Sequence, residues 1–247
     1  MAINLLFNLL KKTMMKTLKS VANPTLILLA LSLTLMGCLK KLDDTTPQAS
    51  ISGLSIIHAS PTIEKLDVYI NQTKVNSSDF AYTNKIDYVN AYSGNRQIWI
   101  SKKGASAILK SENFVLKPQT GYSLFVIEKL DNIGFLFLTD TLTNPPVGKA
   151  KIRFVNLSPD AGALNLAVEG ISGDLVSDKL FKEYSTFKTI NPADRVTFLI
   201  KNKATGAIET TLSNIKIEQG KIYTLWTKGL KTVSGDFAFS ASIFTHK

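Results

Sequence analysis

The sequence predicts an all-β protein of two tandem antiparallel β-sandwich modules, immunoglobulin-like or transthyretin-like in type. Two observations predict this fold. Apolar and polar residues alternate over short segments that are separated by turn-forming residues, and one pattern of motifs occurs twice along the chain. Apolar residues make up 45% of the 247 residues, which is enough to build the cores of such modules.

Residues 1–37 have the composition of a secretory signal peptide. Four lysines precede an apolar run at residues 25–36, and the first acidic residue is Asp43. A helix of that length rises about 18 Å, less than the roughly 30 Å hydrocarbon core of a bilayer. We therefore expect an export signal and not a permanent span. Translation from Met14 or Met15 would give a signal of more usual length.

Cys38 is the only cysteine of the chain, so neither an internal disulfide nor a zinc site built on paired cysteines can form. The stretch Leu35-Met36-Gly37-Cys38 resembles the lipobox of bacterial lipoproteins. That resemblance implies that the chain is cut before Cys38 and that Cys38 carries lipid chains, which anchor a protein stably when there are two or more. The expected location is the outer membrane of the cell envelope, with the periplasmic or surface face left open.

Residues 38–50 are expected to be the lipidated cysteine and a flexible tether, because they are polar and without apolar periodicity. Two copies of one motif follow. Residues 56–70 and 154–168 share a Ser-Pro pair and an alternating segment, at an offset of 98 residues. Residues 121–124 and 222–225 are a second matching pair, at an offset of 101. Two copies of one structural unit are the economical interpretation.

The boundary between the copies is predicted at the proline-containing segment 143–148, because prolines end strands. The first module is therefore expected at 51–147 and the second at 148–247. Within the first module, residues 133–138 are apolar at nearly every position, which predicts a strand covered on both faces.

The first copy resembles a known family. His58-Ala59-Ser60-Pro61, followed by residues 66–71, is similar to the opening of the domain of unknown function family 4397, a bacterial extracellular β-sandwich module found on lipoproteins. Residues 116–124 are similar to the strand before that family's last hairpin. The resemblance implies a sandwich fold and an envelope setting, and it implies no reaction.

The resemblance covers residues 51–142 and is less specific over 150–247. In the second copy, Asn156 and Asn165 stand where the family pattern has histidine and aspartate. The two asparagines matter for deciding whether the repeated motif has a catalytic role.

His58 and Asp67 raise the alternative of an envelope hydrolase, because a carboxylate can orient a histidine for acid–base catalysis and the Ser60 hydroxyl is near in sequence. Against it, Asn156 and Asn165 cannot exchange protons at physiological pH. We therefore expect the motif to satisfy backbone groups around the Ser-Pro turn. The residues given this structural role are His58, Ser60, Pro61, Asp67, Asn156, Ser158, Pro159 and Asn165.

Two tryptophans are the candidate binding residues. Trp99 alternates with the apolar Ile98 and Ile100, and Trp226 likewise faces away from its apolar neighbours. An exposed tryptophan on a sheet can stack on a sugar or anchor a protein partner. The alternative is that a loop or the other module covers it. His246 is expected in a solvated tail.

Charge and ligand patterns exclude several function classes. The formal net charge is +10, and four of the lysines precede Cys38, which leaves +6 on the mature chain. The lysines are scattered and no arginine-aromatic cluster occurs, so nucleic-acid binding is not expected. Two histidines and no calcium-loop motif predict no metal site and no cofactor.

The sequence thus predicts a lipid-anchored envelope protein, not an enzyme, with interaction or adhesion modules. Its expected partners are the membrane, through Cys38, and an envelope protein or a glycan. The alternatives are the hydrolase using His58 and Asp67, and an accessory subunit of an outer-membrane nutrient-uptake complex.

Overall fold

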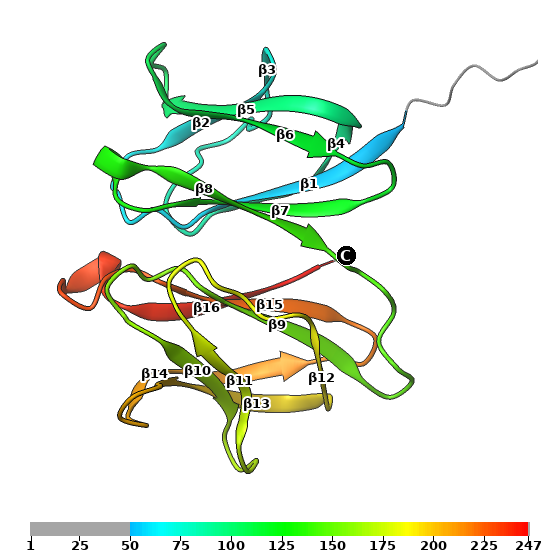
Figure 1. Cartoon of the computed structure of the whole chain (residues 1–247), viewed down its shortest axis with the longest axis vertical. Helices are drawn as coiled ribbons and strands as arrows, with labels where there is room; N and C mark the ends of the chain where they lie inside the picture. The colour runs from blue at the N-terminus through cyan, green and yellow to red at the C-terminus, as the bar shows by residue number, and fades with distance from the viewer. Residues whose placement is uncertain (1–49, 247) are drawn as a thin grey trace, which may run out of the picture. The chain divides into compact units, whose positions relative to one another are not determined.

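The computed structural model describes residues 50–246, which lie within a single compact unit, Ala49–Lys247 (Figure 1). The first sandwich contains β1 (Ile51–His58), β2 (Leu66–Ile70), β3 (Thr73–Lys74), β4 (Lys85–Tyr92), β5 (Gly94–Lys102), β6 (Ile108–Leu116), β7 (Gly121–Ile127), the 3-10 turn η2 (Leu130–Asn132) and β8 (Gly134–Asp140). The second contains β9 (Ala150–Asn156), β10 (Leu164–Val168), β11 (Asp174–Lys179), β12 (Lys188–Ile190), β13 (Ala193–Asn202), β14 (Ile208–Ile217), β15 (Ile222–Lys228), the 3-10 turn η3 (Gly235–Phe237) and β16 (Ser240–Thr245).

The two sandwiches have the same strand order. The first pairs a sheet β4-β1-β7-β8 with a sheet β3-β2-β5-β6, and the second pairs β12-β9-β15-β16 with β11-β10-β13-β14. The predicted all-β class is confirmed. Residues 141–149 connect the sandwiches, and the predicted boundary between residues 147 and 148 lies in this connection.

One strand pair in each sandwich departs from the expected antiparallel arrangement. β1 pairs with β7 in parallel, from Gly53↔Gly121 to His58↔Val126, and β9 pairs with β15 in the same way. A parallel pair needs a long connection between its strands, and here the whole of β2 to β6 supplies it. Local alternation predicts strands but carries no information on the direction of such distant partners.

A repeated tyrosine contact supports the correspondence of the two sandwiches. The Tyr122 hydroxyl accepts a hydrogen bond from the Lys117 N–H at 2.9 Å, and the Tyr223 hydroxyl accepts one from the Glu218 N–H at 2.9 Å. Each tyrosine therefore ties the start of its strand to the loop five residues upstream, as the tyrosine corner of immunoglobulin-type sandwiches does.

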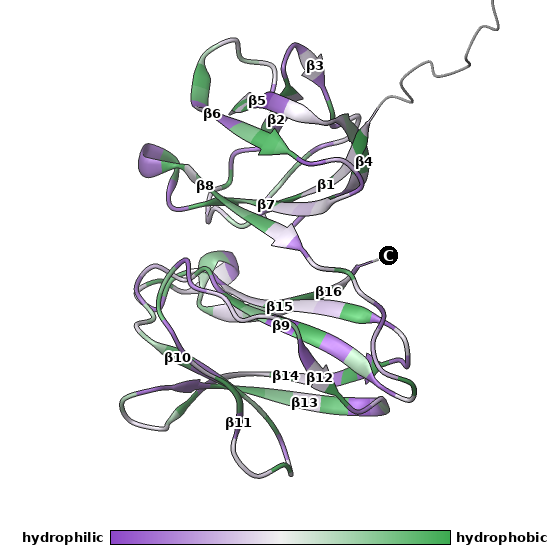
Figure 2. Cartoon of the chain, turned by 45° about the vertical axis from the view of Figure 1, so that its right-hand side comes forward, coloured by the Kyte–Doolittle hydropathy of each residue, from purple (hydrophilic) through white to green (hydrophobic). Residues whose placement is uncertain are grey.

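Each sandwich has its own apolar core, visible as the apolar stretches along the strands in Figure 2. Alternating residues of the facing sheets build it, as period-two strands require. In the first core these include Leu54, Ile56, Leu66, Val68, Ile98, Ile100, Tyr122 and Leu124, and in the second Ile152, Phe154, Leu164, Leu166, Phe198, Ile200, Tyr223 and Leu225.

A third apolar cluster joins the two sandwiches through sheets β4-β1-β7-β8 and β12-β9-β15-β16. We call it the junction cluster, and its buried members are Ile57, Ala59, Phe125, Ile127, Leu138, Val155, Leu157 and Trp226. It explains the strand at residues 133–138: Phe137 packs against the first core, whereas Leu138 is buried in the junction cluster. The prediction of a strand covered on both faces is confirmed.

Candidate functional site

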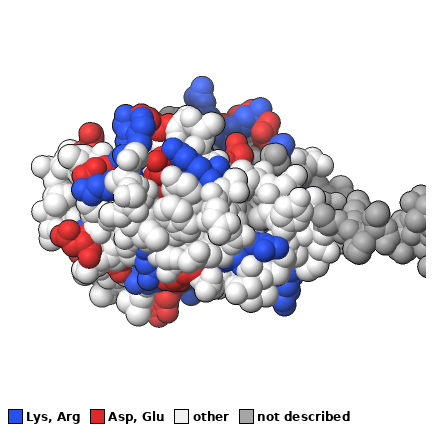
Figure 3. Space-filling view, turned by 90° about the horizontal axis from the view of Figure 1, so that it is seen from above, with Lys and Arg blue, Asp and Glu red and all other residues white. Residues whose placement is uncertain are grey.

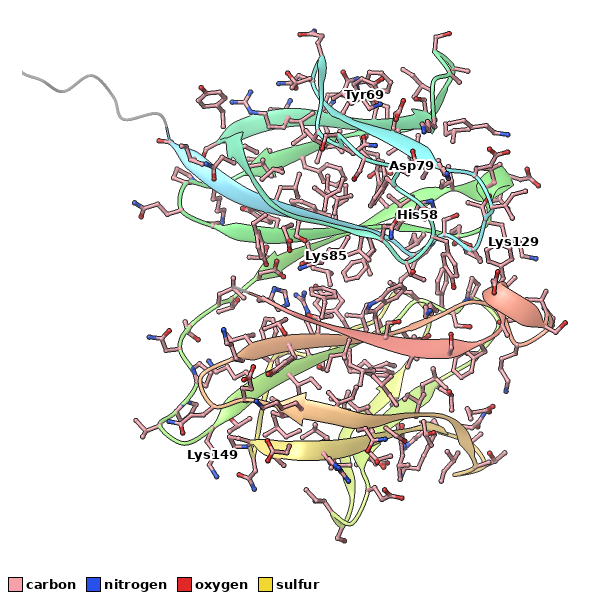
Figure 4. The ribbon with its side chains drawn as sticks, turned by 180° about the vertical axis from the view of Figure 1, so that it is seen from behind. His58, Tyr69, Asp79, Lys85, Lys129 and Lys149 are labelled. Carbon is pink, nitrogen blue, oxygen red and sulfur yellow. The ribbon has the colours of Figure 1, made fainter. Side chains whose placement is uncertain are left out.

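Tyr69 and Trp99 form a stacked aromatic pair on the outer face of sheet β3-β2-β5-β6. They are register partners on β2 and β5, with ring centroids 3.8 Å apart and ring planes 1° from parallel. The Trp99 Nε1–H donates to the Asn71 carbonyl oxygen at 2.6 Å, which fixes the orientation of the indole. Both side chains are half-buried, so part of the pair remains open to solvent. Figure 4 shows Tyr69 on this outer sheet.

Neutral polar groups border the aromatic pair on its β6 side, and on its β3 side lies Lys74, the register partner of Tyr69, which is paired with Asp67. Gln97 Nε2–H donates to Ser111 Oγ at 3.1 Å, and the Gln97 backbone N–H donates to Asn71 Oδ1 at 3.1 Å. Asn113 is the register partner of Gln97 on β6. Figure 3 looks onto this side of the molecule and shows uncharged side chains interspersed with charged side chains of both signs. Aromatic carbon beside amides and hydroxyls suits a neutral, polar ligand.

The second sandwich lacks this aromatic pair at the same register position. There the neighbouring strands β10 and β13 pair Ala167 with Leu199, and Leu199 faces Thr211 as Trp99 faces Ser111. The fold therefore forms without aromatic side chains at this position. The pair at Tyr69 and Trp99 is a feature of the first sandwich alone, and this argues for a role other than folding.

His58 is fully buried at the end of β1, beside Phe80 and Tyr82, with ring centroids at 5.3 and 6.4 Å. Neither ring nitrogen makes a hydrogen bond of normal geometry, and the neighbouring Ser60 Oγ is also buried without a partner. Burial lowers the pKa of His58 to about 4, which the nearby Glu64 carbonyl only partly offsets. The imidazole is therefore neutral at physiological pH.

Asp67 lies on the other sheet, and among the described residues no hydrogen bond or ion pair joins it to His58. It accepts the Gly104 N–H at 3.0 Å and pairs with Lys74 Nζ at 2.6 Å. Burial by itself would raise the pKa of Asp67, but the Gly104, Lys74 and Asn76 contacts outweigh it, and the pKa lies below its ordinary value. The geometry of a catalytic histidine-carboxylate pair is not formed.

The corresponding asparagines of the second sandwich are well bonded. Asn156 Nδ2–H donates to the Gly162 and Lys179 carbonyls, and its Oδ1 accepts the Ser158 N–H at 3.1 Å. This is the support of a Ser-Pro turn that the sequence predicts, and Pro159 follows directly in the same loop. Asn165 instead accepts the N–H of Asp178.

The Ser-Pro turn of the first sandwich is supported differently. The Ser60 carbonyl accepts the Thr62 N–H at 2.9 Å across Pro61, and no side chain of His58 or Asp67 bonds to this turn. The expected backbone support is therefore seen at Asn156, whereas His58 packs among aromatic rings and Asp67 holds the β5–β6 hairpin at Gly104.

Trp226 is covered by the other module, as one of the two alternatives from the sequence has it, whereas His246 differs from its prediction. Trp226 is 2% exposed in the junction cluster, with its ring centroid 6.2 Å from that of Phe125, so the second sandwich packing on the first covers it. The expectation of a solvated tail at His246 is wrong: the side chain is 2% exposed and hydrogen-bonded to the Tyr88 hydroxyl and to Thr224 Oγ1, both at 2.7 Å.

A buried ion pair beside His246 also escaped sequence reasoning. Arg153 Nη2 lies 2.8 Å from Asp140 Oδ1, and both side chains are almost fully buried. The Tyr88 and Ser123 hydroxyls donate to Asp140 Oδ2 at 2.5 and 2.7 Å. The only available signal was a charged residue at an inward position of an otherwise apolar strand, Arg153 within β9.

Cys38 lies outside the described residues, as do the signal and most of the tether. In the described part of the chain, no helix has the length and hydrophobicity needed to cross a bilayer. Residues 50–246 also contain no group of three or more metal-ligating side chains.

The four sheets define this as an all-β protein built of two similar β-sandwiches. The family model Domain of unknown function (DUF4397) matches residues 52–167, which confirms the family resemblance of the first module. The match continues through β9 to near the end of β10, and so includes Asn156 and Asn165. No curated protein matches the chain.

Among solved structures, the chain is similar to a family 26 carbohydrate-binding module from Eubacterium rectale Amy13K in complex with maltoheptaose, at 12% identity and a TM-score of 0.28, covering 79% of this chain and 96% of that one. A putative cell adhesion protein from Bacteroides uniformis matches at 7% identity and a TM-score of 0.25, covering 80% and 99%. The fimbrial anchor protein Mfa2 from Porphyromonas gingivalis matches at 10% identity and a TM-score of 0.23, covering 79% of this chain and 97% of that one. No conclusion about a ligand follows from likenesses this weak.

Proposed function

We propose that this protein is a lipid-anchored, non-catalytic binding protein of the cell envelope, and that Tyr69 and Trp99 contact a neutral glycan. One observation carries the proposal. A half-buried aromatic stack lies on the outer sheet face between the neutral Ser111 and the ion-paired Lys74, at a register position where the second sandwich has Ala167 and Leu199.

The chemistry of this face suits a sugar. A sugar ring presents C–H groups that pack on aromatic carbon, and hydroxyls that both donate and accept hydrogen bonds. Gln97 and Asn113 each supply an amide donor and acceptor next to the indole. The stack uses one face of each ring, and the neighbour of Trp99 on its other side is the short side chain of Ser111.

The absence of catalysis is proposed on the placement of His58 and Asp67. The imidazole is buried against Phe80 and Tyr82, whereas the carboxylate is engaged by Lys74 and Gly104. General acid–base chemistry needs the two groups within hydrogen-bond reach of one substrate.

Binding to an array of neutral oligosaccharides tests the ligand class. The intact chain should bind at least one neutral glycan, and Trp99→Ala and Tyr69→Ala should each weaken that binding about tenfold or more, since a hot-spot aromatic contributes about 2 kcal/mol or more. Leu199→Ala is the matched control at the same register position and should bind normally. Undiminished binding by Trp99→Ala, or capture of protein baits with no neutral glycan bound, would overturn the proposal.

The anchor is tested separately. Cells grown with radioactive palmitate should label the native chain and leave the Cys38→Ala variant unlabelled, with the label in the membrane fraction. Equal label in both chains would show that Cys38 is not the lipid attachment site.

A further inference from the structure

A second, chemically different groove lies where the two sandwiches meet. It has a volume of about 470 Å³ and is lined by the first sandwich's loops at Thr62–Ile63 and 81–83 and by Lys228, Asp236 and Phe237 of the second. The volume is within the range of about 300–1,000 Å³ that ligand sites span. The long β15–β16 loop, which contains η3, brings Phe237 against Tyr82, with ring centroids 5.3 Å apart.

The groove contains an ammonium group without a counter-ion. Lys228 is the last residue of β15, and its Nζ lies over the Tyr82 ring, 5.5 Å from the ring centroid. Among the described residues, no carboxylate lies within ion-pair distance of this Nζ, although Asp236 lines the same groove. Burial lowers the pKa of Lys228. A partly desolvated cation of this kind gains free energy when an anion binds beside it.

The aromatic wall also holds an unused hydrogen-bonding group. The Tyr82 hydroxyl is buried and has no hydrogen-bond partner among the described residues. Behind it, His58 and Ser60 are likewise buried with unpaired polar atoms. These polar atoms are closed off from solvent, so a molecule in the groove would meet the Tyr82 ring and not its hydroxyl.

The residue that corresponds to Tyr82 in the second sandwich is a packed aromatic side chain, and the lysine next to it is ion-paired. Thr83 and Lys182 have the same backbone role: their N–H groups donate to the carbonyls of His58 and Asn156, and both have positive φ, 73° and 70°. Phe181 therefore corresponds to Tyr82.

At the position of Phe181 the chemistry differs in two ways. Phe181 has no hydroxyl and packs against the junction cluster, and Lys182 Nζ pairs with Glu128 at 2.8 Å. A groove lies at the position of Tyr82 and Lys228, where no carboxylate among the described residues pairs with the lysine, whereas the lysine next to Phe181 is paired.

We propose that this groove binds the carboxylate of an acidic sugar residue. Lys228 supplies the charge, the Tyr82 ring supplies an aromatic surface for the sugar ring, and Thr62 and Thr83 line the groove beside them. A sugar suits the lining better than a peptide does, because the walls present hydroxyls and aromatic carbon and no strand edge. This proposal does not rest on Tyr69 and Trp99, so the outcome of one test does not decide the other.

Calorimetric titration of the full-length chain in detergent with digalacturonic acid tests the proposal, with the neutral disaccharide of galactose and a triaspartate peptide as comparison ligands. Digalacturonic acid should bind, and binding should weaken with added salt. Lys228→Gln should lose about tenfold or more in affinity, whereas Tyr82→Phe, which keeps the ring, should bind nearly as the native chain does. Lys182→Gln, at the ion-paired lysine next to Phe181, is the control and should bind as the native chain does.

Equal binding of the neutral disaccharide, equal or tighter binding of the triaspartate peptide, or unchanged affinity in Lys228→Gln would overturn the proposal. A second readout does not depend on a variant. Digalacturonic acid should protect Lys228 from acetylation in the native chain, as measured by mass spectrometry, while Lys216 remains reactive. Acetylation of Lys228 at an unchanged rate would exclude the site even where the variants fail to fold.

Discussion

Asp140 and His246 occupy the same position in the two sandwiches, and their side chains meet at the junction with Oδ2 and Nδ1 4.0 Å apart. Asp140 is the register partner of Gly121 at the start of β7, and the His246 N–H donates to the carbonyl of Ile222 at the start of β15. Residues that correspond by duplication have therefore diverged into a complementary pair.

The same divergence extends to their neighbours. Ser123 donates to Asp140 in the first sandwich, and its counterpart Thr224 is hydrogen-bonded to His246 in the second, both at 2.7 Å. Arg153 then closes the network by pairing with Asp140 across the junction. Complementary polar groups at corresponding positions give the junction a defined pairing that apolar packing alone would not specify.

Removing Arg153 should be costly. Arg153→Met leaves the buried Asp140 carboxylate without its charge partner, which typically costs roughly 3–5 kcal/mol of unfolding free energy, measured by urea denaturation. The double variant Asp140→Leu with Arg153→Met should recover much of that loss, because no uncompensated charge remains. Lys216→Met, which breaks an exposed pair with Glu218, should cost less than about 0.5 kcal/mol. A loss at Arg153→Met as small as this would contradict a structural role for the ion pair.

Stability should fall between pH 6.5 and about 4. Burial lowers the pKa of His58 and, although Asp140 opposes it, that of His246 from 6.5 to about 4. Below pH 6.5 the unfolded chain binds protons that the folded chain does not, so the folded state loses stability until the folded pKa is passed. Arg153 and Lys85 also face His246 and favour its neutral form.

Unfolding free energies measured from pH 7.5 to pH 4 test this. His246→Gln should flatten the dependence, because glutamine keeps hydrogen-bonding groups for Tyr88 and Thr224 and does not titrate in this range. An identical pH profile in the native and His246→Gln chains would show that His246 does not cause the pH dependence of stability.

Replacing each of the two tryptophans by alanine should have clearly different effects on the free energy of unfolding. Trp226→Ala removes a fully buried ring from the junction cluster and should cost about 3–5 kcal/mol in a denaturation experiment. Trp99→Ala removes a half-buried ring from an outer face and should cost clearly less, while abolishing the proposed glycan binding. A larger stability loss at Trp99 than at Trp226 would reverse this assignment.

Gly229 should tolerate no side chain. Its φ is +74°, and an added Cβ would lie 2.3 Å from the Ala238 carbonyl oxygen, so the β15–β16 loop must move. Gly229→Ala should cost roughly 3 kcal/mol or more of unfolding free energy. Gly170→Ala is the matched control, since its φ is +77° but its surroundings are open, and about 1 kcal/mol is expected there. Equal costs at the two glycines would mean that the close contact is easily relieved.

The alternation of apolar residues and the repeated Ser-Pro motif determined, by themselves, the sandwich fold, the doubly covered strand at residues 133–138 and the family of the first module. These are local or repeated properties, since a strand's inward face is set by its period of two. The outward position of Trp99 followed from the same rule.

Only the tertiary structure decided what happens where the two sandwiches meet. Trp99 and Trp226 show the same alternation, yet Trp99 is half-buried and Trp226 is fully buried, because only Trp226 lies on a sheet that packs against another module. The ion pair of Arg153 with Asp140 and the hydrogen bond of His246 with Tyr88 also form only because the two sheets pack together. Contacts between sheets depend on how two finished surfaces fit together, and no pattern within one strand contains that information.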